Sequence, residues 1–256
     1  MIAIIPARYA SSRLPGKMLL PIAGKPLILH TLEQATRARN VSLVLVATDD
    51  ERIYSVVTKN GGSAVMTSTE HRSGSDRVAE VAEKMPVGSI IVNVQGDEPA
   101  ISPRTIELAV EALIADEQAD MSTTCEAITE YGQLINPNVV KVVISDQGYA
   151  IYFSRSAVPY PREMVNKYGS LLQAFASKPK MLSRFRKHTG IYVYRRDYLL
   201  KFAGMKQSKL EQIEMLEQLR ALETGAKIKV VEINESSIGV DTTEDFERVR
   251  EVLEGR

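Results

Sequence analysis

The chain has 256 residues, of which 44% are hydrophobic and 25% charged, a composition that is typical of a globular protein and excludes a disordered or collagen-like chain. Its 32 basic and 32 acidic residues give a formal net charge of zero, so no global field attracts nucleic acid or an anionic membrane. The single cysteine, Cys125, excludes an internal disulfide framework, and no apolar run reaches the ~18 to 20 residues of a membrane span, so we expect a cytoplasmic protein without nucleic-acid or membrane partners.

The first half of the chain alternates short β-rich runs with helical patterns, an order that predicts parallel βαβ units. The predicted elements are strands at residues 2–5, 43–47, 63–66 and 90–94 and helices at 26–39, 51–59 and 75–84. The runs at 2–5 and 90–92 are apolar on successive residues, as expected for central strands that helices cover on both faces. Ligands of open α/β sheets bind beyond the carboxyl ends of the strands, so we expect a site in segments 6–17 and 95–99.

The pattern changes in the second half. From about residue 121 to 194 several β-like runs, including 139–144, 149–153 and 190–194, predict a mainly antiparallel subdomain. Within it, the polar stretch 159–188 is too long for an ordinary connector and predicts a lid or an interface arm. A long helix at 208–223, a strand at 227–233 and a last helix at 243–253 follow. We therefore predict one α/β domain, 1–256, with a β-rich subdomain inserted at about 121–203.

A basic loop follows the first predicted strand. Arg8, Arg13 and Lys17 place three cations at intervals of five and four residues. Residues 1–48 contain six basic residues and one acidic residue, so the zero net charge of the chain conceals a positive patch. Arginine grips phosphate oxygens with a planar fork and lysine supplies a compact charge, so the loop suits a polyanion. Neither a Walker loop nor a GxGxxG fingerprint is present, and the alternative is a solvated basic loop.

Two aspartates stand at the ends of other predicted elements. Asp97 follows a buried-type strand in the sequence Gly-Asp-Glu-Pro, where a carboxylate can hold Mg²⁺ together with substrate phosphates. Asp241 directly precedes the last predicted helix and is free to face a ligand, since Thr242 and Asp245 match a capping box. The alternatives are that Asp97 caps a turn before Pro99 and that Asp241 only marks the entrance of the helix.

Motifs spread over nearly the whole chain complete this picture. They are Pro-Ala-Arg-Tyr-Ala-Ser-Ser-Arg-Leu-Pro-Gly-Lys from Pro6, Val-Ala-Thr-Asp from Val46, His-Arg-Ser-Gly-Ser-Asp-Arg from His71, residues 93–99, Tyr-Phe-Ser-Arg from Tyr152, His-Thr-Gly-Ile-Tyr from His188, residues 214–220 and residues 239–242. Together, and in this order, they resemble the 3-deoxy-manno-octulosonate cytidylyltransferase family, also called the CMP-KDO synthetase family.

The resemblance implies a fold, an activity and an assembly. The fold is a Rossmann-like nucleotidyltransferase three-layer sandwich with a mixed, mainly parallel sheet and a smaller antiparallel β-rich subdomain. This subdomain, at about 121–203, would serve sugar binding and dimerisation. The activity is the Mg²⁺-dependent reaction of CTP with 3-deoxy-D-manno-octulosonate (KDO), which gives CMP-KDO and diphosphate for lipopolysaccharide biosynthesis. The assembly is a homodimer.

The resemblance also implies roles for individual residues. Its catalytic set is Arg13, Lys17, Asp97 and Asp241, of which Asp97 and Asp241 share the metal. Its nucleotide-binding set is Ala7, Arg8, Arg13, Lys17, Ser73, Gly74, Arg77, Gln95 and Asp97. Its sugar-binding set is Gln95, Arg155, His188, Tyr192, Glu217 and Gln218.

The sugar-binding assignments have structural alternatives. On a helical wheel Glu217 lies within ~40° of Leu210 and Ile213, at the edge of the apolar face of the helix predicted at 208–223. We therefore expect it to be partly buried and to need partners such as sugar hydroxyls. A solvated glutamate is the alternative. His188, beside an apolar strand, is alternatively a structural histidine, and Arg155 is alternatively part of a structural salt bridge. The rival functions are transfer to another acidic sugar, of the amino-KDO or sialic acid type, and nucleotide binding without catalysis.

Overall fold

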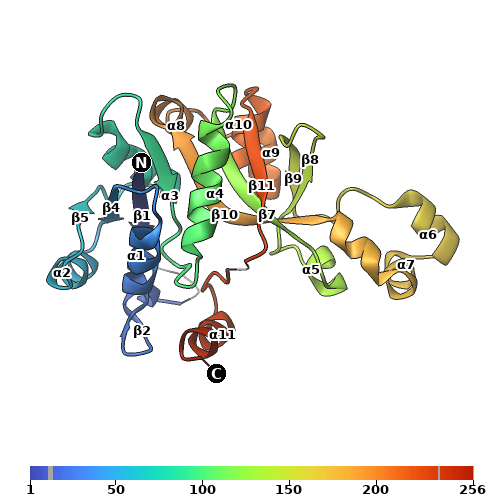
Figure 1. Ribbon diagram of the computed structural model, residues 1–256, viewed down its shortest axis with the longest axis horizontal. Helices are drawn as coiled ribbons and strands as arrows, with labels where there is room; N and C mark the ends of the chain where they lie inside the picture. Colours follow the sequence, from blue (N-terminus) through green and yellow to red (C-terminus); the bar gives the residue numbers. More distant parts are fainter. Residues whose placement is uncertain (11–13, 236, 256) are drawn as a thin grey trace.

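A mixed sheet forms the centre of the computed structural model, which describes residues 1–10, 14–235 and 237–255 (Figure 1). The strands follow the order β11-β7-β10-β6-β1-β4-β5, and β8 and β9 extend from β10. They are β1 Ile2–Ala7, β4 Leu43–Thr48, β5 Ala64–Met66, β6 Ile90–Asn93, β7 Met121–Ala127, β8 Lys141–Ile144, β9 Ala150–Ser154, β10 Arg186–Arg195 and β11 Ile228–Glu232. A small hairpin, β2 Pro21–Ile22 with β3 Lys25–Pro26, lies apart from this sheet.

The pairing of the strands is parallel in the first half of the chain and mixed in the second. Strand β1 is parallel to β4 and β6, and β4 is parallel to β5. Strand β10 is antiparallel to β6, β7 and β8, whereas β11 is parallel to β7. The predicted βαβ units and the antiparallel pairing after residue 121 are therefore confirmed. The proposed division at 121–203 stays a prediction, since β7 and β10 belong to the main sheet.

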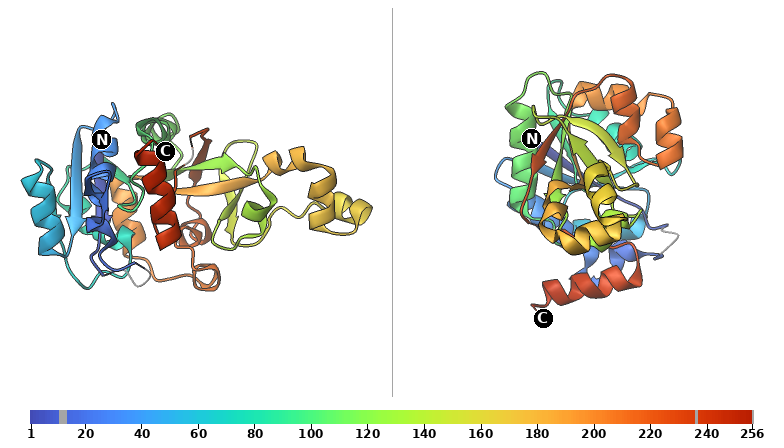
Figure 2. Two further views of the ribbon diagram at one scale, coloured as in Figure 1. Left: turned by 90° about the horizontal axis from the view of Figure 1, so that it is seen from below. Right: turned by 90° about the vertical axis from the view of Figure 1, so that its right-hand side faces the viewer.

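Helices cover both faces of the sheet, which makes three layers (Figures 1 and 2). Ala3 and Ile5 of β1 pack with α1 Leu27–Arg37, α2 Glu51–Lys59 and α4 Pro103–Ile114. Ile4 packs on the other face with α3 Gly74–Glu83, α8 Arg196–Ala203 and α10 Gln218–Glu223. Because β1 needs an apolar residue toward each layer, its residues are apolar in succession, and Ala3, Ile4 and Ile5 are fully buried.

The helix predicted at 208–223 is wrong as one continuous element. The structure has two short helices, α9 Lys209–Glu214 and α10, and Met215 between them adopts a left-handed conformation with φ of 52°. The turn at Met215 buries Leu216 while it leaves Ile213 and Met215 about three-quarters exposed, at 77% and 75%. The helical-wheel argument for Glu217 is therefore wrong as well, because Ile213 does not belong to a buried face.

An arm extends away from the sheet between β9 and β10 (Figure 1). It contains α6 Arg162–Tyr168, α7 Leu171–Ser177 and the 3₁₀ helix η2 Pro179–Arg184. Its own apolar cluster includes Phe175, Leu182 and Phe185 and packs against α5 Tyr131–Ile135. The polar stretch predicted at 159–188 is thus a helical protrusion, and its role as a lid or an interface arm stays a prediction.

The last helix, α11 Thr243–Leu253, has the predicted bounds and begins at the predicted capping box. The Thr242 side chain accepts from Asp245 N, and the Asp245 carboxylate accepts from Thr242 N. Helix α11 joins the core mainly through Val249, with Phe246 and Leu253 partly buried beside it. In the described part of the chain, no helix combines the length and apolar character that crossing a bilayer requires.

Candidate active site

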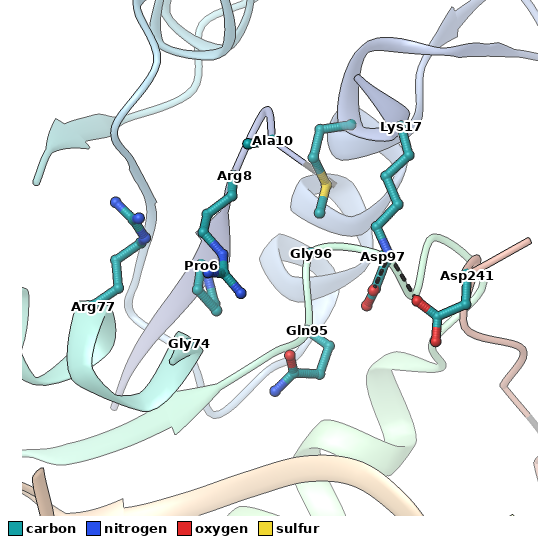
Figure 3. Close-up of a pocket in the computed structure, with 11 residues that line it drawn as sticks. Pro6, Arg8, Ala10, Lys17, Gly74, Arg77, Gln95, Gly96, Asp97 and Asp241 are labelled. Carbon is teal, nitrogen blue, oxygen red and sulfur yellow. Dashed lines mark hydrogen bonds and ion pairs between the residues drawn. The ribbon is translucent and has the colours of Figure 1, made fainter. Parts of the chain in front are cut away.

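A cavity of about 530 Å³ opens where strands β1 and β6 end. This is the edge at which ligands bind in open α/β sheets. Figure 3 shows Arg8 and Arg77 on one side of the cavity and Asp97 and Asp241 on the other. The lining residues are Pro6, Arg8, Ala10, Lys17, Met18, Gly74, Arg77, Gln95, Gly96, Asp97 and Asp241. Residues from both segments in which the sequence predicts a site therefore line one cavity.

Lys17 connects the two aspartates. Its Nζ donates to Asp97 Oδ2 at 2.6 Å, to Asp241 Oδ1 at 3.0 Å and to the backbone oxygen of Val240 at 2.8 Å. An ammonium group has three N–H donors, and each acceptor here takes one of them. The Lys17 side chain is only 8% exposed, so these contacts replace its hydration almost completely. Asp97 and Asp241 thus converge on one point, which a cationic nitrogen occupies.

Backbone contacts bring these aspartates together from distant parts of the sequence. Val240 N donates to Asp97 O at 2.8 Å, which fixes the segment before α11 to the segment after β6. The latter segment also packs directly on β1, since a Cβ at Gly96 would lie 2.7 Å from the backbone oxygen of Pro6. Thr31 Oγ1 of α1 donates to Gly96 O at 3.0 Å. The glycine is therefore required by the close approach of the two chain segments.

The predicted nucleotide-binding residues lie in different environments. Arg8 is exposed and lines the cavity, and Gly74 lies at the start of α3. Arg77 also lines the cavity but is fully buried, and its NH2 donates to Asp49 Oδ2 at 2.6 Å. Ser73 caps α3 by accepting from Asp76 N.

Two described members of the nucleotide-binding set, Ala7 and Ser73, do not line this cavity. Ala7 is buried at the end of β1, where it pairs with Thr48, and Arg13 lies outside the described residues. Gln95 and Asp97, by contrast, line the cavity. The roles of all of these residues stay predictions.

A second cavity, of about 820 Å³, adjoins the first and shares Arg8 and Gly74 with it. Glu217 lines this cavity, and its Oε1 accepts from Ser75 Oγ at 2.5 Å. Burial raises the pKa of the Glu217 carboxyl. Glu217 is thus partly buried, as expected, but the turn between α9 and α10 places it there.

His188 and Tyr192 pack against each other on β10. Their ring centroids are 5.2 Å apart, and the His188 ring meets Phe153 edge-on at 5.1 Å. His188 Nε2 is hydrogen-bonded to Thr123 Oγ1 at 2.8 Å. Desolvation lowers the pKa of His188 to about 3, so the imidazole is neutral at pH 7. Desolvation also raises the pKa of Tyr192.

Arg155 and Gln218 complete the predicted sugar-binding set. Arg155 Nε donates to Glu214 O at 2.7 Å and its NH1 donates to Pro137 O at 2.9 Å. Gln218 is buried at the start of α10. Of the described residues that line the two cavities, none is Arg155, His188, Tyr192 or Gln218. Within the predicted sugar set, Gln95 lines the first cavity and Glu217 lines the second.

Some residues of the site carry little signal in the sequence. Val240 contributes a backbone oxygen, which any residue possesses. Glu98 lies so close to β10 that a Cβ at Gly190 would be 2.9 Å from its Oε1. Burial, followed by the neighbouring Asp97 carboxylate, raises the pKa of Glu98 to about 7. The motif containing Gly-Asp-Glu-Pro could have suggested Glu98, but only the fold shows its contact with Gly190.

The acceptors around Lys17 Nζ are the hard oxygens that Mg²⁺ prefers. No group of three or more His, Cys, Asp or Glu side chains suited to a metal ion occurs among the residues that the structure describes. Asp97 and Asp241 offer two carboxylates at one point, and Mg²⁺ is usually held by one or two carboxylates together with substrate phosphates. The donor set fits a substrate-completed magnesium site.

Comparisons with known proteins agree with this geometry. The family model described as "Cytidylyltransferase" matches residues 2–228. A 3-deoxy-manno-octulosonate cytidylyltransferase from Geotalea uraniireducens is 52% identical over 251 residues, which are 98% of this chain and 98% of the relative. The chain belongs to the 3-deoxy-manno-octulosonate cytidylyltransferase family. Membership confirms the predicted family and the enzyme class, a nucleotidyltransferase.

Other relatives and solved structures extend the comparison. The enzyme of the same description from Geobacter sulfurreducens is 50% identical, with 98% of each chain covered. The solved structure of a CMP:2-keto-3-deoxy-manno-octonic acid synthetase complexed with CTP has a TM-score of 0.88 and 42% identity and covers 99% of this chain and 98% of its own. A putative glucose-1-phosphate thymidylyltransferase from Bacillus anthracis, at 16% identity and a TM-score of 0.67 over 98% of this chain and 95% of its own, shares the fold. The predicted nucleotidyltransferase fold is therefore confirmed.

Proposed function

We propose that the protein joins a cytidylyl group from CTP to KDO, which gives CMP-KDO and diphosphate and supplies the activated sugar for lipopolysaccharide biosynthesis. The observation that carries this proposal is the single cavity at the ends of β1 and β6, in which Arg8 faces the pair Asp97 and Asp241. Cations suited to phosphates and carboxylates suited to a metal ion are the groups that phosphoryl transfer needs. The choice of cytosine as the base and of KDO as the sugar rests on membership of the family.

The proposed reaction forms one bond and breaks one. The anomeric 2-hydroxyl oxygen of KDO attacks the α-phosphorus of CTP, and the bond from this phosphorus to the oxygen that bridges it to the β-phosphorus breaks. The hydroxyl proton is released and diphosphate leaves with its negative charge. Arg8, Arg13 and Lys17 bind the phosphates and stabilise that charge. No covalent intermediate with the enzyme is required.

Asp97 and Asp241 would hold Mg²⁺ together with oxygens of the substrates. When bound, such an ion polarises a phosphoryl oxygen and lowers the pKa of a coordinated hydroxyl. The two carboxylates lie at one end of the cavity, with Gln95 in the same lining. A metal ion held by these carboxylates could therefore bind the attacking hydroxyl as well as a phosphate oxygen.

The proposed sugar site uses the second cavity as well as the first. Gln95 and Glu217 offer an amide and a carboxyl group to sugar hydroxyls from the two linings. Arg155, His188, Tyr192 and Gln218 would complete the sugar site from outside these two linings. Arg155 is hydrogen-bonded to backbone oxygens, His188 and Tyr192 pack against each other, and Gln218 is buried.

We also propose a homodimer in the cytoplasm. Four large apolar residues on neighbouring segments of the chain are each more than half exposed: Tyr160 and Leu172 in the arm, Ile151 in β9, which leads into the arm, and Ile135 in α5, against which the arm packs. Exposed apolar residues that gather on one part of a protein are typical of an interaction surface. Light scattering after size exclusion should give a dimer mass that Leu172→Asp lowers. Val87→Asp, at another exposed apolar position, should leave the mass unchanged.

A substrate panel tests the proposed activity. Diphosphate release from CTP and Mg²⁺ should give the highest kcat/KM with KDO, compared with amino-KDO and sialic acid. A preference for one of the other sugars would overturn the sugar assignment and keep the cytidylyltransferase. CTP binding in a calorimeter without turnover of any sugar acid would overturn catalysis and favour a nucleotide-binding regulator.

A further inference from the structure

Lys17 contacts more than one element of the site. Besides the carboxylates of Asp97 and Asp241, its Nζ binds the backbone oxygen of Val240 in the segment that leads into α11. A lysine that binds phosphate must instead direct its ammonium group into the cavity, because three acceptors already use its three N–H donors. The arrangement around Lys17 therefore differs from the one in which Lys17 holds a triphosphate.

Lys17 Nζ lies between the carboxylates of Asp97 and Asp241, where a counter-ion is needed. Two carboxylates lie within 3.0 Å of the same nitrogen, so their mutual repulsion requires a cation between them. Without such a cation, two like charges this close would repel each other, although the side chains of Asp97 and Asp241 stay 26% and 44% exposed. The same two carboxylates are the proposed ligands of Mg²⁺, so the ammonium group and the ion would occupy overlapping positions.

We propose that Lys17, before it binds phosphate, serves as the internal cation of Asp97 and Asp241, and that a divalent cation displaces it toward the cavity. In the metal-free state the ammonium group neutralises the carboxylates and holds the Asp241 segment against the end of β6. A divalent cation would neutralise the carboxylates and hold the Asp241 segment in its place, so Lys17 would become available to bind phosphate. The inference deepens the proposed function and rests on it.

The displacement predicts that metal and triphosphate assist one another. The ammonium group of Lys17 occupies the site in most molecules, so only the remaining fraction can bind an external cation. The apparent affinity for that cation is lowered by the same fraction. A triphosphate that attracts Lys17 away would raise that fraction. Free cation should therefore bind weakly and should bind more tightly once nucleotide is present.

Amine footprinting of the unmodified protein tests the displacement directly. Lys17 is 8% exposed and should react slowly with an acylating reagent, whereas Lys25, which is 34% exposed and paired with Glu33, serves as the internal reference. Adding Mn²⁺ without nucleotide should raise acylation of Lys17 severalfold and leave Lys25 unchanged, as measured by mass spectrometry. Equal acylation of Lys17 with and without saturating Mn²⁺ would overturn the inference.

A charge-free variant provides the second test. In Lys17→Met, Mn²⁺ without nucleotide should bind about tenfold more tightly than in the unmodified protein, because the competing cation is gone. Hydrogen exchange at Val240 N–H, which donates to Asp97 O, should accelerate in the metal-free variant and slow again with Mn²⁺. Lys25→Met is the matched control. Unchanged or weaker Mn²⁺ binding by Lys17→Met would overturn the inference.

Neither test uses CTP or KDO. Failure of the inference is therefore distinguishable from failure of the proposed function. An enzyme that passes the substrate panel but keeps Lys17 unreactive in Mn²⁺ would retain its activity assignment and lose only the displacement of Lys17.

Discussion

The region around Lys17 and the region around His188 illustrate two ways in which polar residues become buried. Lys17 meets two carboxylates and a backbone oxygen at the edge of a cavity, so its neighbours are charged. His188 meets the rings of Phe153 and Tyr192 and the hydroxyl of Thr123, so its neighbours are neutral. We propose that the first region exchanges one cation for another, whereas the second favours a neutral imidazole.

The difference between the two regions leads to opposite expectations for substitutions. Removing a charge from the Lys17 region leaves a partner without its counter-ion, and such changes affect binding and catalysis. Removing His188 takes away ring contacts and a neutral hydrogen bond, so we expect its loss to lower the melting temperature. Four substitutions can break or sharpen this contrast.

Substitution of Asp97 should have the largest effect. Asp97→Ala removes a proposed metal ligand and leaves Lys17 with Asp241 and the Val240 oxygen, so kcat for diphosphate release should fall on the order of 10³-fold. Circular dichroism should show an unchanged fold. Asp146→Ala, on an exposed turn, is the control. An active Asp97→Ala enzyme would remove the chemical distinction between the two regions.

The two regions also differ in how far the sequence predicts them. Arg8, Lys17 and Asp97 follow apolar strands, and because β1 and β6 are adjacent and parallel their carboxyl ends meet. The periodicity of the chain thus predicts both the central sheet and the edge at which this cavity opens. Only the family resemblance predicts Asp241 in this site. A backbone hydrogen bond from Val240 N to Asp97 O brings the Asp241 segment to the cavity, where Lys17 contacts both aspartates.

The remaining parts of the molecule depend on tertiary contacts that periodicity does not contain. The helical pattern at 208–223 is real, but burial of Leu216 and the ion pair of Glu211 with Arg220 favour a turn at Met215. Helices α4, α5 and α8 were not among the predicted elements. The packing of His188 and Tyr192 needs strands from distant parts of the chain, so the sequence alone left the structural alternative open.

Gly96 tests whether the first region depends on close packing of its backbone. An added Cβ would lie 2.7 Å from Pro6 O, so Gly96→Ala should force β1 and the segment before Asp97 apart. We expect destabilisation by roughly 1–3 kcal/mol, together with a loss of activity. Gly132→Ala, whose Cβ would meet no atom within 4 Å, should change little. Equal melting temperatures for the two variants would show that the first region tolerates expansion.

Arg52 tests how the basic loop is supported. Its guanidinium carbon lies 3.3 Å from the centroid of the Tyr9 ring, and its side chain also binds Asp50. Tyr9 O accepts from Gly16 N at 3.1 Å, so the ring stands at the base of the loop that joins Arg8 to Lys17. A cation–π contact contributes roughly 0.5–2 kcal/mol, so Arg52→Ala should raise KM for CTP about threefold to tenfold with little change in kcat.

The control for Arg52 lies at the other end of the same helix. Lys59→Ala should leave KM for CTP unchanged, since Lys59 is exposed at the last position of α2. A lower melting temperature of Arg52→Ala with an unchanged KM would assign Arg52 to stability alone. The phosphate side of the cavity would then extend only to Arg8 and Lys17.

His188 provides the smallest and most specific test. Its folded-state pKa is lowered to about 3, so protonation favours the unfolded chain, in which the pKa is about 6.5. The stability contributed by the neutral ring is complete above about pH 6.5 and decreases as the pH falls toward 3. His188→Gln retains a hydrogen-bonding group for Thr123 but does not titrate there, so its melting temperature should fall less between pH 7 and pH 5. Parallel melting curves for the two proteins would mean that His188 is hydrated, and the contrast between a charged and a neutral region would then fail at His188.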